Sequence, residues 1–488
     1  MGGPGRILLA HSYFLVYDAK QTRKMRPYPP LATLITASVL RALGHEVHLF
    51  DAMLAKGEME FEEKLRDVRP DVVGLLEDNF NFLTKMCTTR MRDAALAMVA
   101  AARAQGCRVA ANGPDVSDHP ELYLGAGADA VILGETERTF PELVDAWASG
   151  ASTVVGIAGL ALSDATGRVH RTPTRPFVED LDALPLPAWD LVDASRYRAA
   201  WLRAHGRMSW NVVTTRGCPF HCNWCAKPLY GTRYAQRSPA AVAAELAALK
   251  KKIQPGHVWF ADDIFGLTPR WIESFAEEVL ARNARIPFTM QSRVDLMTPS
   301  AVAALADAGA EEVWMGVESG AQKILDAMEK GTRIEQVRRA TRLLRANGVK
   351  PSWFLQLGYP GETWEDVLAT RALLREERPH DVGVSVSYPL PGTAFYDRVR
   401  DQMQTKTNWS DTDELAMLFE GTYTSPFYRT VRDLLHAEAL VLAGMEGPMA
   451  APEIDAAWRD LARREGEFRS ERSILPAAKL PRAATGAS

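Results

Sequence analysis

Short apolar runs alternate with helical stretches along most of the chain, and this alternation limits the possible fold more than any other feature. Strands that alternate with helices predict a parallel sheet covered on both faces. We therefore expect a flavodoxin-like (Rossmann-type) α/β domain over residues 1–150. Its expected strands are residues 6–10, 46–50, 71–76, 108–111 and 129–133.

The alternation stops near residue 151 and returns with longer helices. Residues 151–205 are rich in proline and predict a linker. Residues 206–400 predict a partial (β/α)6 barrel, in which functional groups gather at the carboxyl ends of the strands. Its expected strands are residues 210–215, 257–262, 288–292, 312–317, 351–358 and 381–387. A small, mostly helical C-terminal region (401–465) and a disordered tail (466–488) follow.

Composition and charge exclude several classes of protein. The 57 basic and 61 acidic residues give a net charge of −4, so we expect no nucleic-acid or anionic-membrane surface. No apolar run reaches the ~18–20 residues of a membrane span. The first residues predict a core strand and no signal peptide, hence a cytoplasmic protein.

Five cysteines in the chain are too few for a disulfide framework, and Cys87 and Cys107 are expected as buried structural thiols.

The other three cysteines, Cys218, Cys222 and Cys225, follow the first barrel strand directly. Thiolates bind zinc or iron–sulfur clusters in reducing compartments. A closed zinc site needs a fourth ligand, and His221 adjoins Cys222 too closely to share a metal with both flanking cysteines. Three thiolates on a [4Fe–4S] cluster leave one iron open for a substrate or cofactor. Zinc and incidental thiols remain alternatives.

With this motif, residues 209–400 resemble the radical S-adenosylmethionine (SAM) enzymes. The resemblance implies that S-adenosyl-L-methionine chelates the open iron and that one electron cleaves it to methionine and a 5′-deoxyadenosyl radical. It also implies an electron donor such as flavodoxin or ferredoxin. Phe220 and Trp224 lie inside the motif and are candidates to pack against the cluster or the adenine. The alternative is that they are exposed aromatics covering the loop.

Polar residues at the expected strand ends suit the amino acid and ribose groups of SAM. Arg293 suits its carboxylate as a charge-assisted donor. For Asp262, Ser319 and the turn at residues 360–363, helix capping and turn formation are an equal alternative. The cofactor-binding candidates in this domain are Phe220, Trp224, Asp262, Asp263, Gln291, Ser292, Arg293 and Glu318.

The first domain resembles the cobalamin-binding domains that precede many radical SAM enzymes. Residues 26–52, 70–82, 112–120 and 127–144 carry the resemblance. The chain departs from other cobalamin proteins because it lacks their Asp-x-His-x-x-Gly motif, and Asp115 stands where relatives often have a histidine. The lower face of the cobalt is therefore unassigned, and a domain that binds nothing is the alternative. The candidates near the corrin are His11, Tyr13, Asn79, Gly113, Gly134 and Glu135.

Residues 419–436 are similar to the tail of the anaerobic oxidative cyclase branch of the family. The resemblance implies a cobalamin-dependent C-methyltransferase (class B) that acts on an unactivated carbon of a small-molecule or natural-product substrate, through a 5′-deoxyadenosyl radical and methylcobalamin. The alternative is an oxidative cyclase or rearrangement enzyme with a tetrapyrrole-like substrate and no methyl transfer.

Two other classes fit the sequence less well. RNA methylthiolation would require a second three-cysteine set and a basic RNA-binding module, which Cys87, Cys107 and the net charge do not supply. A non-catalytic binding protein would have no use for an open iron. Aromatic residues in the C-terminal region could line a substrate pocket, although a packed lid core is the more common arrangement. They are Trp409, Phe419, Tyr423, Phe427 and Tyr428.

Overall fold

The computed structural model describes residues 5–80, 88–151, 153–225, 230–403 and 415–470. Cys87, Trp409 and most of the predicted tail, residues 471–488, lie outside the described residues. Residues 466–470, also predicted as tail, are described: the Phe468 carbonyl accepts a hydrogen bond from the Thr424 amide at 2.9 Å. No described helix is both long and apolar enough to cross a bilayer.

The first sheet has seven strands in the order β2-β1-β3-β4-β5-β6-β7. β1 to β5 are parallel, which confirms the flavodoxin-like fold. Apart from the exposed first residues Arg6, Glu46 and Arg108, these strands are mostly apolar and buried on both faces, because helices cover the sheet. Their bounds are β1 Arg6–Ala10, β2 Glu46–Phe50, β3 Val72–Leu76, β4 Arg108–Asn112 and β5 Ala130–Ile132.

The helices of the first domain follow the predicted alternation. Glycines or left-handed residues end several of them, as at Arg69 after α3. The bounds are α1 Ala19–Lys24, α2 Leu31–Ala42, α3 Glu58–Val68, α5 Thr89–Ala104, α6 Pro114–Asp118, α7 Pro120–Gly125 and α8 Thr136–Ala148.

The range predicted as a linker contains two strands and a helix. β6 (Leu160–Ser163) pairs antiparallel with β5, and β7 (Val169–Arg171) pairs antiparallel with β6. Leu160, Ala161 and Leu162 are buried, so the hairpin covers what would otherwise be an open sheet edge. Helix α9 (Ala194–His205) then leads into the second domain.

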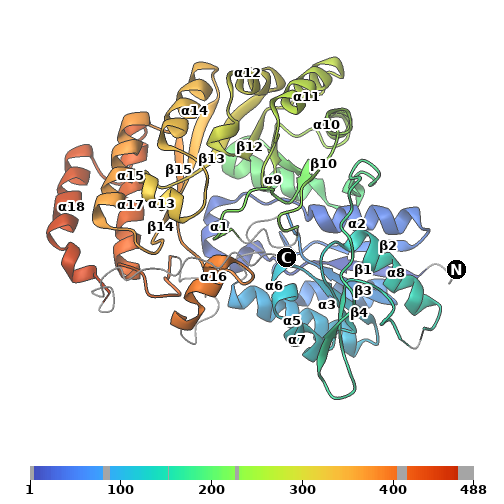
Figure 1. The fold of residues 1–488 in the computed structure, drawn as a ribbon. Helices are drawn as coiled ribbons and strands as arrows, with labels where there is room; N and C mark the ends of the chain where they lie inside the picture. Colours follow the sequence, from blue (N-terminus) through green and yellow to red (C-terminus); the bar gives the residue numbers. More distant parts are fainter. Residues whose placement is uncertain (1–4, 81–87, 152, 226–229, 404–414, 471–488) are drawn as a thin grey trace, which may run out of the picture.

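The second sheet is parallel, with six strands in the order β15-β14-β13-β12-β11-β8, which confirms the partial barrel. Its helices lie outside the strands (Figure 1). The first predicted strand stops early, at Val212, because the next residues turn away to form β9 (Thr215–Arg216), which pairs with β10 (Ala235–Gln236). The strands are β8 Ser209–Val212, β11 His257–Phe260, β12 Phe288–Ser292, β13 Ala310–Glu318, β14 Lys350–Leu357 and β15 Asp381–Val386.

Three barrel helices begin at a capping residue, because Ser238, Thr268 and Thr298 accept a hydrogen bond from the first turn with their side chains. The bounds are α10 Pro239–Lys252, α11 Pro269–Ala281, α12 Pro299–Ala308, α13 Gln322–Ala327, α14 Ile334–Ala346, α15 Trp364–Glu377, α16 Ala394–Val399, α17 Ser425–Leu442 and α18 Ala451–Arg463.

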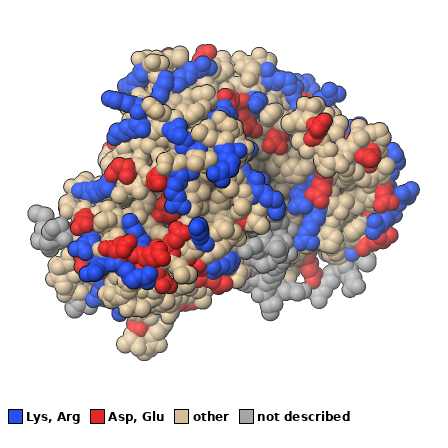
Figure 2. All heavy atoms as spheres, turned by 180° about the vertical axis from the view of Figure 1, so that it is seen from behind, with Lys and Arg blue, Asp and Glu red and all other residues tan. Residues whose placement is uncertain are grey.

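The C-terminal helices α17 and α18 lie at the β15 end of the second sheet, away from the first domain (Figure 1). Tyr423, Phe427 and Tyr428 are buried in the main core, with the Tyr423 and Phe427 ring centroids 4.0 Å apart. This placement fits the packed lid core. On the face seen in Figure 2, acidic and basic side chains lie next to one another, in keeping with the small net charge.

Candidate functional site

The loop that carries the three cysteines, residues 213–236, begins where β8 ends and is held at its base by Asp262. Asp262 lies two residues beyond the end of β11. Its carboxylate accepts hydrogen bonds from the Thr214 amide (2.7 Å), the Thr214 hydroxyl (2.8 Å) and the Thr215 amide (2.7 Å). Asp262 is buried, and burial raises its pKa to about 7. The base of the loop is thus fixed to the neighbouring strand. We call residues 213–236 the cluster loop.

Gly217 is required by the shape of this loop. It has φ +76°, and a Cβ at this position would lie 1.9 Å from the Arg233 carbonyl oxygen. The next amide, that of Cys218, donates to the Gly231 carbonyl at 3.4 Å. Two segments of the loop therefore run in contact just before the first cysteine, and only glycine fits there.

Asn223 anchors the middle of the loop. Its amide and side-chain Nδ2 donate to the Met328 carbonyl (3.1 Å) and the Ala327 carbonyl (2.9 Å). Its Oδ1 accepts from the buried hydroxyl of Tyr359 at 2.9 Å. Asn223 was not among the residues predicted from the sequence, because an asparagine between two cysteines carries no distinctive spacing signal.

The donor set fits an iron–sulfur cluster. All three cysteines are partly exposed, and Arg293 Nη1 lies 3.8 Å from the Cys222 Sγ. In the described part of the chain, no three His, Cys, Asp or Glu side chains gather closely enough to hold one metal ion. A cube of four irons takes each thiolate on a different iron, so it does not require the three sulfurs to converge on one point.

Two cations lie beside the cysteines. Arg293 has its guanidinium 3.7 Å from the Phe220 ring centroid and donates to both carboxylate oxygens of Asp295. Lys330 is buried and pairs with Glu318 at 2.7 Å. Burial alone would lower the pKa of Lys330, but the charges of Glu318 and Cys222 raise it, so the ammonium stays charged. No feature of the sequence had pointed to Lys330.

Glu318 is the last residue of β13 and has a left-handed backbone, with φ +64°. This conformation is uncommon for a non-glycine residue and coincides with a register shift against β14. A Cβ on Gly316 would lie 2.6 Å from both Glu318 Oε1 and Lys330 Nζ, so Gly316 leaves room for this ion pair. The backbone at the end of β13 therefore accommodates the Glu318–Lys330 ion pair.

The remaining barrel candidates fall into two groups. Ser292 and Trp224 keep a buried polar atom without a hydrogen-bond partner among the described residues, namely Ser292 Oγ and Trp224 Nε1. Both could therefore donate to a bound ligand. Gln291 is half-buried, with its carbonyl accepting from the Phe265 amide at 3.0 Å, and Asp263 is exposed. All four remain predictions as ligand-binding residues.

The carboxyl edge of the first sheet carries a buried amide network. Asn79 Nδ2 donates to Asn112 Oδ1 (3.2 Å), and Asn112 Nδ2 donates to the carbonyls of Ile132 and Gly134, both at 2.9 Å. Asn79 Oδ1 is buried with no partner among the described residues. Gly134 has φ +91°, and a Cβ there would meet nothing within 4 Å. An open glycine beside an unpaired acceptor fits the contact edge of a polar ligand such as a corrin.

Other candidates of the first domain have contacts within the protein. His11 is buried and bonded to Asp51 (3.0 Å), and Tyr13 donates to Asp18 (3.2 Å). Burial alone would lower the pKa of His11, but Asp51 raises it above its usual value. A Cβ on Gly113 would lie 2.8 Å from the Glu77 Cβ. Their roles at a corrin remain predictions.

Asp115, which stands where relatives often have a histidine, accepts hydrogen bonds from two neighbouring helices. It accepts from Arg92 Nε at 2.9 Å and from the Tyr123 hydroxyl at 2.8 Å. Its carboxylate thus holds α5 and α7 to α6. Asp115 therefore has a structural role that does not involve cobalt.

The two carboxyl edges face each other. Phe80, after β3, stacks on Tyr230 of the cluster loop, with ring centroids 5.6 Å apart and an interplanar angle of 17°. Glu135, predicted as a corrin contact, pairs with Arg216 of the cluster loop and accepts from the Val178 amide. The sequence had not indicated Arg216, although it precedes the first cysteine by two residues.

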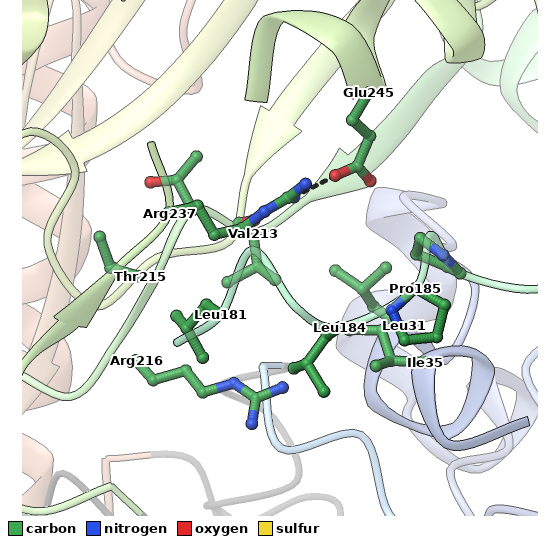
Figure 3. Close-up of a pocket in the computed structure, with 12 residues that line it drawn as sticks. Leu31, Ile35, Leu181, Leu184, Pro185, Val213, Thr215, Arg216, Arg237 and Glu245 are labelled. Atoms are coloured by element: carbon green, nitrogen blue, oxygen red, sulfur yellow. Dashed lines mark hydrogen bonds and ion pairs between the residues drawn. The ribbon is translucent and has the colours of Figure 1, made fainter. Parts of the chain in front are cut away.

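A small cavity lies beside this contact, between α2, the segment after β7 and the end of β8 (Figure 3). Its charged side chains are paired: Arg237 with Glu245, and Arg216 with Glu135 and Glu137. The rest of its wall is apolar except for Thr214 and Thr215, and none of the three cysteines lines it, so the cavity lies beside the cluster site and is not part of it. The other residues that line it are Leu31, Ile35, Leu181, Leu184, Pro185, Pro187, Val213, Thr214 and Thr215.

Comparison with known families agrees with this geometry. Residues 212–374 match the Radical SAM superfamily, and residues 26–144 match the B12 binding domain. The chain therefore belongs to the radical SAM enzymes that carry a cobalamin-binding domain. Its cofactors are a [4Fe–4S] cluster, S-adenosyl-L-methionine and cobalamin.

Curated relatives and solved structures extend the match. An uncharacterized methyltransferase of Pyrococcus horikoshii is 29% identical over 78% of this chain and 81% of its own length. The anaerobic magnesium-protoporphyrin IX monomethyl ester cyclase of Rubrivivax gelatinosus is 27% identical over 77% and 67%. The radical SAM methyltransferase TsrM from Kitasatospora setae shares the fold, with a TM-score of 0.66 at 21% identity, over 81% of this chain and 76% of that one.

Proposed function

We propose that this enzyme transfers a methyl group to an unactivated carbon of a small-molecule substrate. The observation that carries the proposal is the contact between the two cofactor edges: the loops after β3 and β5 of the B12-binding domain touch the cluster loop through Phe80, Glu135 and Arg216. An enzyme that makes a substrate radical and then methylates it requires both cofactors to face one substrate.

The chain's own residues bind and orient SAM in this proposal. Arg293 and Lys330 supply positive charge for a carboxylate, and Glu318 supplies negative charge for an ammonium. Trp224 and Phe220 cover the loop and exclude water from the radical. Trp224 Nε1 and Ser292 Oγ, which have no partner among the described residues, are free to donate hydrogen bonds.

When bound, the cluster and SAM supply the radical that removes a hydrogen atom, and cobalamin supplies the methyl group. One SAM is consumed for each hydrogen atom removed, and a second replaces each methyl group transferred. Product, 5′-deoxyadenosine and S-adenosylhomocysteine are therefore expected in equal amounts. Each turnover would require two electrons, one for the cleavage of SAM and one to return the cobalamin to the state that accepts the next methyl group, and both would come from the proposed partner, a flavodoxin or ferredoxin. A cytoplasmic location stays a prediction.

The second candidate function is oxidative cyclisation, which the cyclase relative of Rubrivivax gelatinosus favours. It would consume SAM for hydrogen abstraction without any methyl transfer. The two functions differ in one product, because only methyl transfer releases S-adenosylhomocysteine.

The test begins with iron and cobalt content after anaerobic purification with cobalamin supplied. About four irons and one cobalt per chain are expected. The reduced protein is then incubated with SAM, with and without cobalamin, and both SAM products are quantified. Cobalamin-dependent S-adenosylhomocysteine supports methyl transfer. Formation of 5′-deoxyadenosine alone would favour the cyclase, and absence of retained cobalt would leave methyl transfer without its donor.

A further inference from the structure

Three buried charges join the B12-binding domain to the cluster loop. Arg216 Nη1 pairs with Glu135, the residue before α8, and Arg216 Nη2 pairs with Glu137 in the first turn of α8 at 2.5 Å. The three side chains are at most 5% exposed. Figure 3 shows Arg216 extending from the loop on the side of the cavity opposite the Arg237–Glu245 pair. We call these three residues the carboxylate clamp.

The clamp has a single favourable geometry. A planar guanidinium whose two nitrogens each meet a carboxylate fixes direction as well as distance. The ring of Phe80 and the ring of Tyr230, from opposite sides of the interface, lie 5.7 and 5.5 Å from the Arg216 guanidinium carbon. Because the charges are buried, removing one partner leaves another without compensation, which favours the paired state strongly.

The clamp lies between the two predicted cofactor contacts. On one side, Glu135 directly follows Gly134, the open glycine at the carboxyl edge of the first sheet. On the other side, Arg216 is separated from Cys218 only by Gly217, whose backbone is in contact with the Arg233 carbonyl. The path from one cofactor edge to the other therefore crosses a few residues that have little freedom to move.

We propose that Arg216, Glu135 and Glu137 are positioning residues that set the separation and orientation of the cluster relative to the cobalamin. The inference rests on the proposed function, because it takes both cofactors to act on one substrate. The clamp touches neither cofactor in this proposal. It acts through Gly134 on one side and through Gly217 and Cys218 on the other.

The first measurement is independent of activity and of methyl transfer. Amide hydrogen exchange is compared in the full-length, cofactor-free protein and in two variants, Arg216→Gln and Arg216→Lys. In Arg216→Gln, exchange in residues 134–138 and 213–217 is expected to accelerate about tenfold or more, while β13 to β15 keep their protection. Arg216→Lys keeps the charge without the planar fork and is expected to fall between Arg216→Gln and the parent protein. Unchanged exchange in the two segments of Arg216→Gln would overturn the proposal.

The second measurement reports the relation of the cofactors directly. In the reduced holoenzyme, the paramagnetic cluster accelerates the spin relaxation of a nearby cob(II)alamin, which power saturation of its EPR signal measures. Arg216→Gln is expected to weaken this acceleration several-fold with iron and cobalt content retained, and Arg216→Lys to weaken it less. Equal saturation in the parent protein and Arg216→Gln would overturn the positioning role, even if methyl transfer is found.

The matched control is Arg41→Gln. Arg41 on α2 also forms an ion pair across the chain, with Asp190 at 2.7 Å, but the pair is on the surface. The control removes the same charge and is expected to leave both readouts unchanged, since exposed pairs contribute little. If Arg41→Gln changes them as much as Arg216→Gln does, the effect is general loss of charge and the clamp has no special role.

Discussion

At the scale of the residue, Gly217 is the position with the least room for change. Gly217→Ala would place a methyl group 1.9 Å from the Arg233 carbonyl oxygen, at a residue with φ +76°. We expect the cluster loop to open and the reconstituted protein to retain less than about half of the parent's iron, since the loop cannot accept both the methyl group and its native path. Iron content and the visible absorption of the cluster after anaerobic reconstitution measure this.

Gly231 provides the matched control on the same loop. It also has positive φ, +59°, but a Cβ there would meet nothing within 4 Å. Gly231→Ala therefore costs only the conformational penalty of about 1 kcal/mol, and the cluster should still assemble. Equal iron content in the two variants would show that the close contact at Gly217 is not what shapes the loop.

His257 predicts a pH dependence of stability. Its Nδ1 and Nε2 are bonded to the hydroxyls of Ser209 (2.8 Å) and Thr289 (3.0 Å), and burial lowers its pKa to about 4. The unfolded histidine, with a pKa near 6.5, gains a proton between pH 6.5 and 4 that the folded one does not. Its contribution is thus complete above pH 6.5 and decreases as the pH falls, by about 2 kcal/mol at pH 5.

Urea denaturation of the cofactor-free protein at pH 7.5 and pH 5 measures this contribution. The buried Asp262, with a raised pKa, changes stability in the opposite direction over this range, so the parent must be compared with His257→Gln. The difference in unfolding free energy between the two should shrink by about 2 kcal/mol on going to pH 5. His170→Gln, at an exposed position on β7, is the control and should follow the parent.

The sequence could predict some of these residues and not others. Three cysteines at a fixed spacing are a local pattern, so they were found without a structure. Arg216 and Asn223 bond partners that lie 79 and 136 residues away along the chain. Lys330 pairs with Glu318, at the end of β13, where the backbone is left-handed. The local spacing of residues in the sequence does not reveal such contacts. Glu135 was selected by its place after a strand, but the contact that the structure gives it is with Arg216.

At the scale of the element, the Asp262 carboxylate connects the segment after β11 to the segment after β8. Asp262→Ala would remove both carboxylate oxygens, so the three hydrogen bonds from Thr214 and Thr215 are lost in a buried place. We expect a loss of about 2 kcal/mol or more of stability and slower SAM cleavage. Urea denaturation and 5′-deoxyadenosine formation under reducing conditions measure these.

Asp263→Ala is the control for this prediction, because it makes the same chemical change one residue further on, at an exposed side chain. Its effect on stability should stay within about 0.5 kcal/mol. If both variants behave alike, the connection between the segments after β8 and β11 does not depend on the buried carboxylate.

Most helices and strands can be predicted from the sequence, because an apolar run of four to six residues between two helices is buried in few ways other than as a strand of a parallel sheet. The exceptions are where tertiary contacts outweigh local pattern. β6 and β7 are short and lie in a proline-rich region, and they form because the edge of β5 is available to pair with. β8 ends early because Thr214 and Thr215 bond Asp262, so the chain leaves the sheet although its residues favour a strand.

At the scale of the whole molecule, the two domains share one core, which the predicted division at residues 151–205 did not suggest. Tyr197 and Trp201 of α9 belong to the same buried cluster as Ile7 of the first sheet and Trp210 of β8. Tyr197 also donates to Asp51 after β2 at 2.7 Å. Domain boundaries can be read from a change of pattern along a sequence, but an interface formed by distant aromatics cannot.

Trp201→Ala tests whether this shared core holds the domains together. Trp201 is buried, its Nε1 donates to the Pro27 carbonyl at 2.7 Å, and its ring lies 5.3 Å from that of Tyr28. Removing it should cost about 3–5 kcal/mol and reduce hydrogen-exchange protection on both sides of the interface, at residues 25–34 and 208–213. Leu202→Ala, the exposed neighbour on α9, should cost less than about 1 kcal/mol. Loss of protection on one side alone would mean that the two domains are stable independently and that α9 belongs to only one of them.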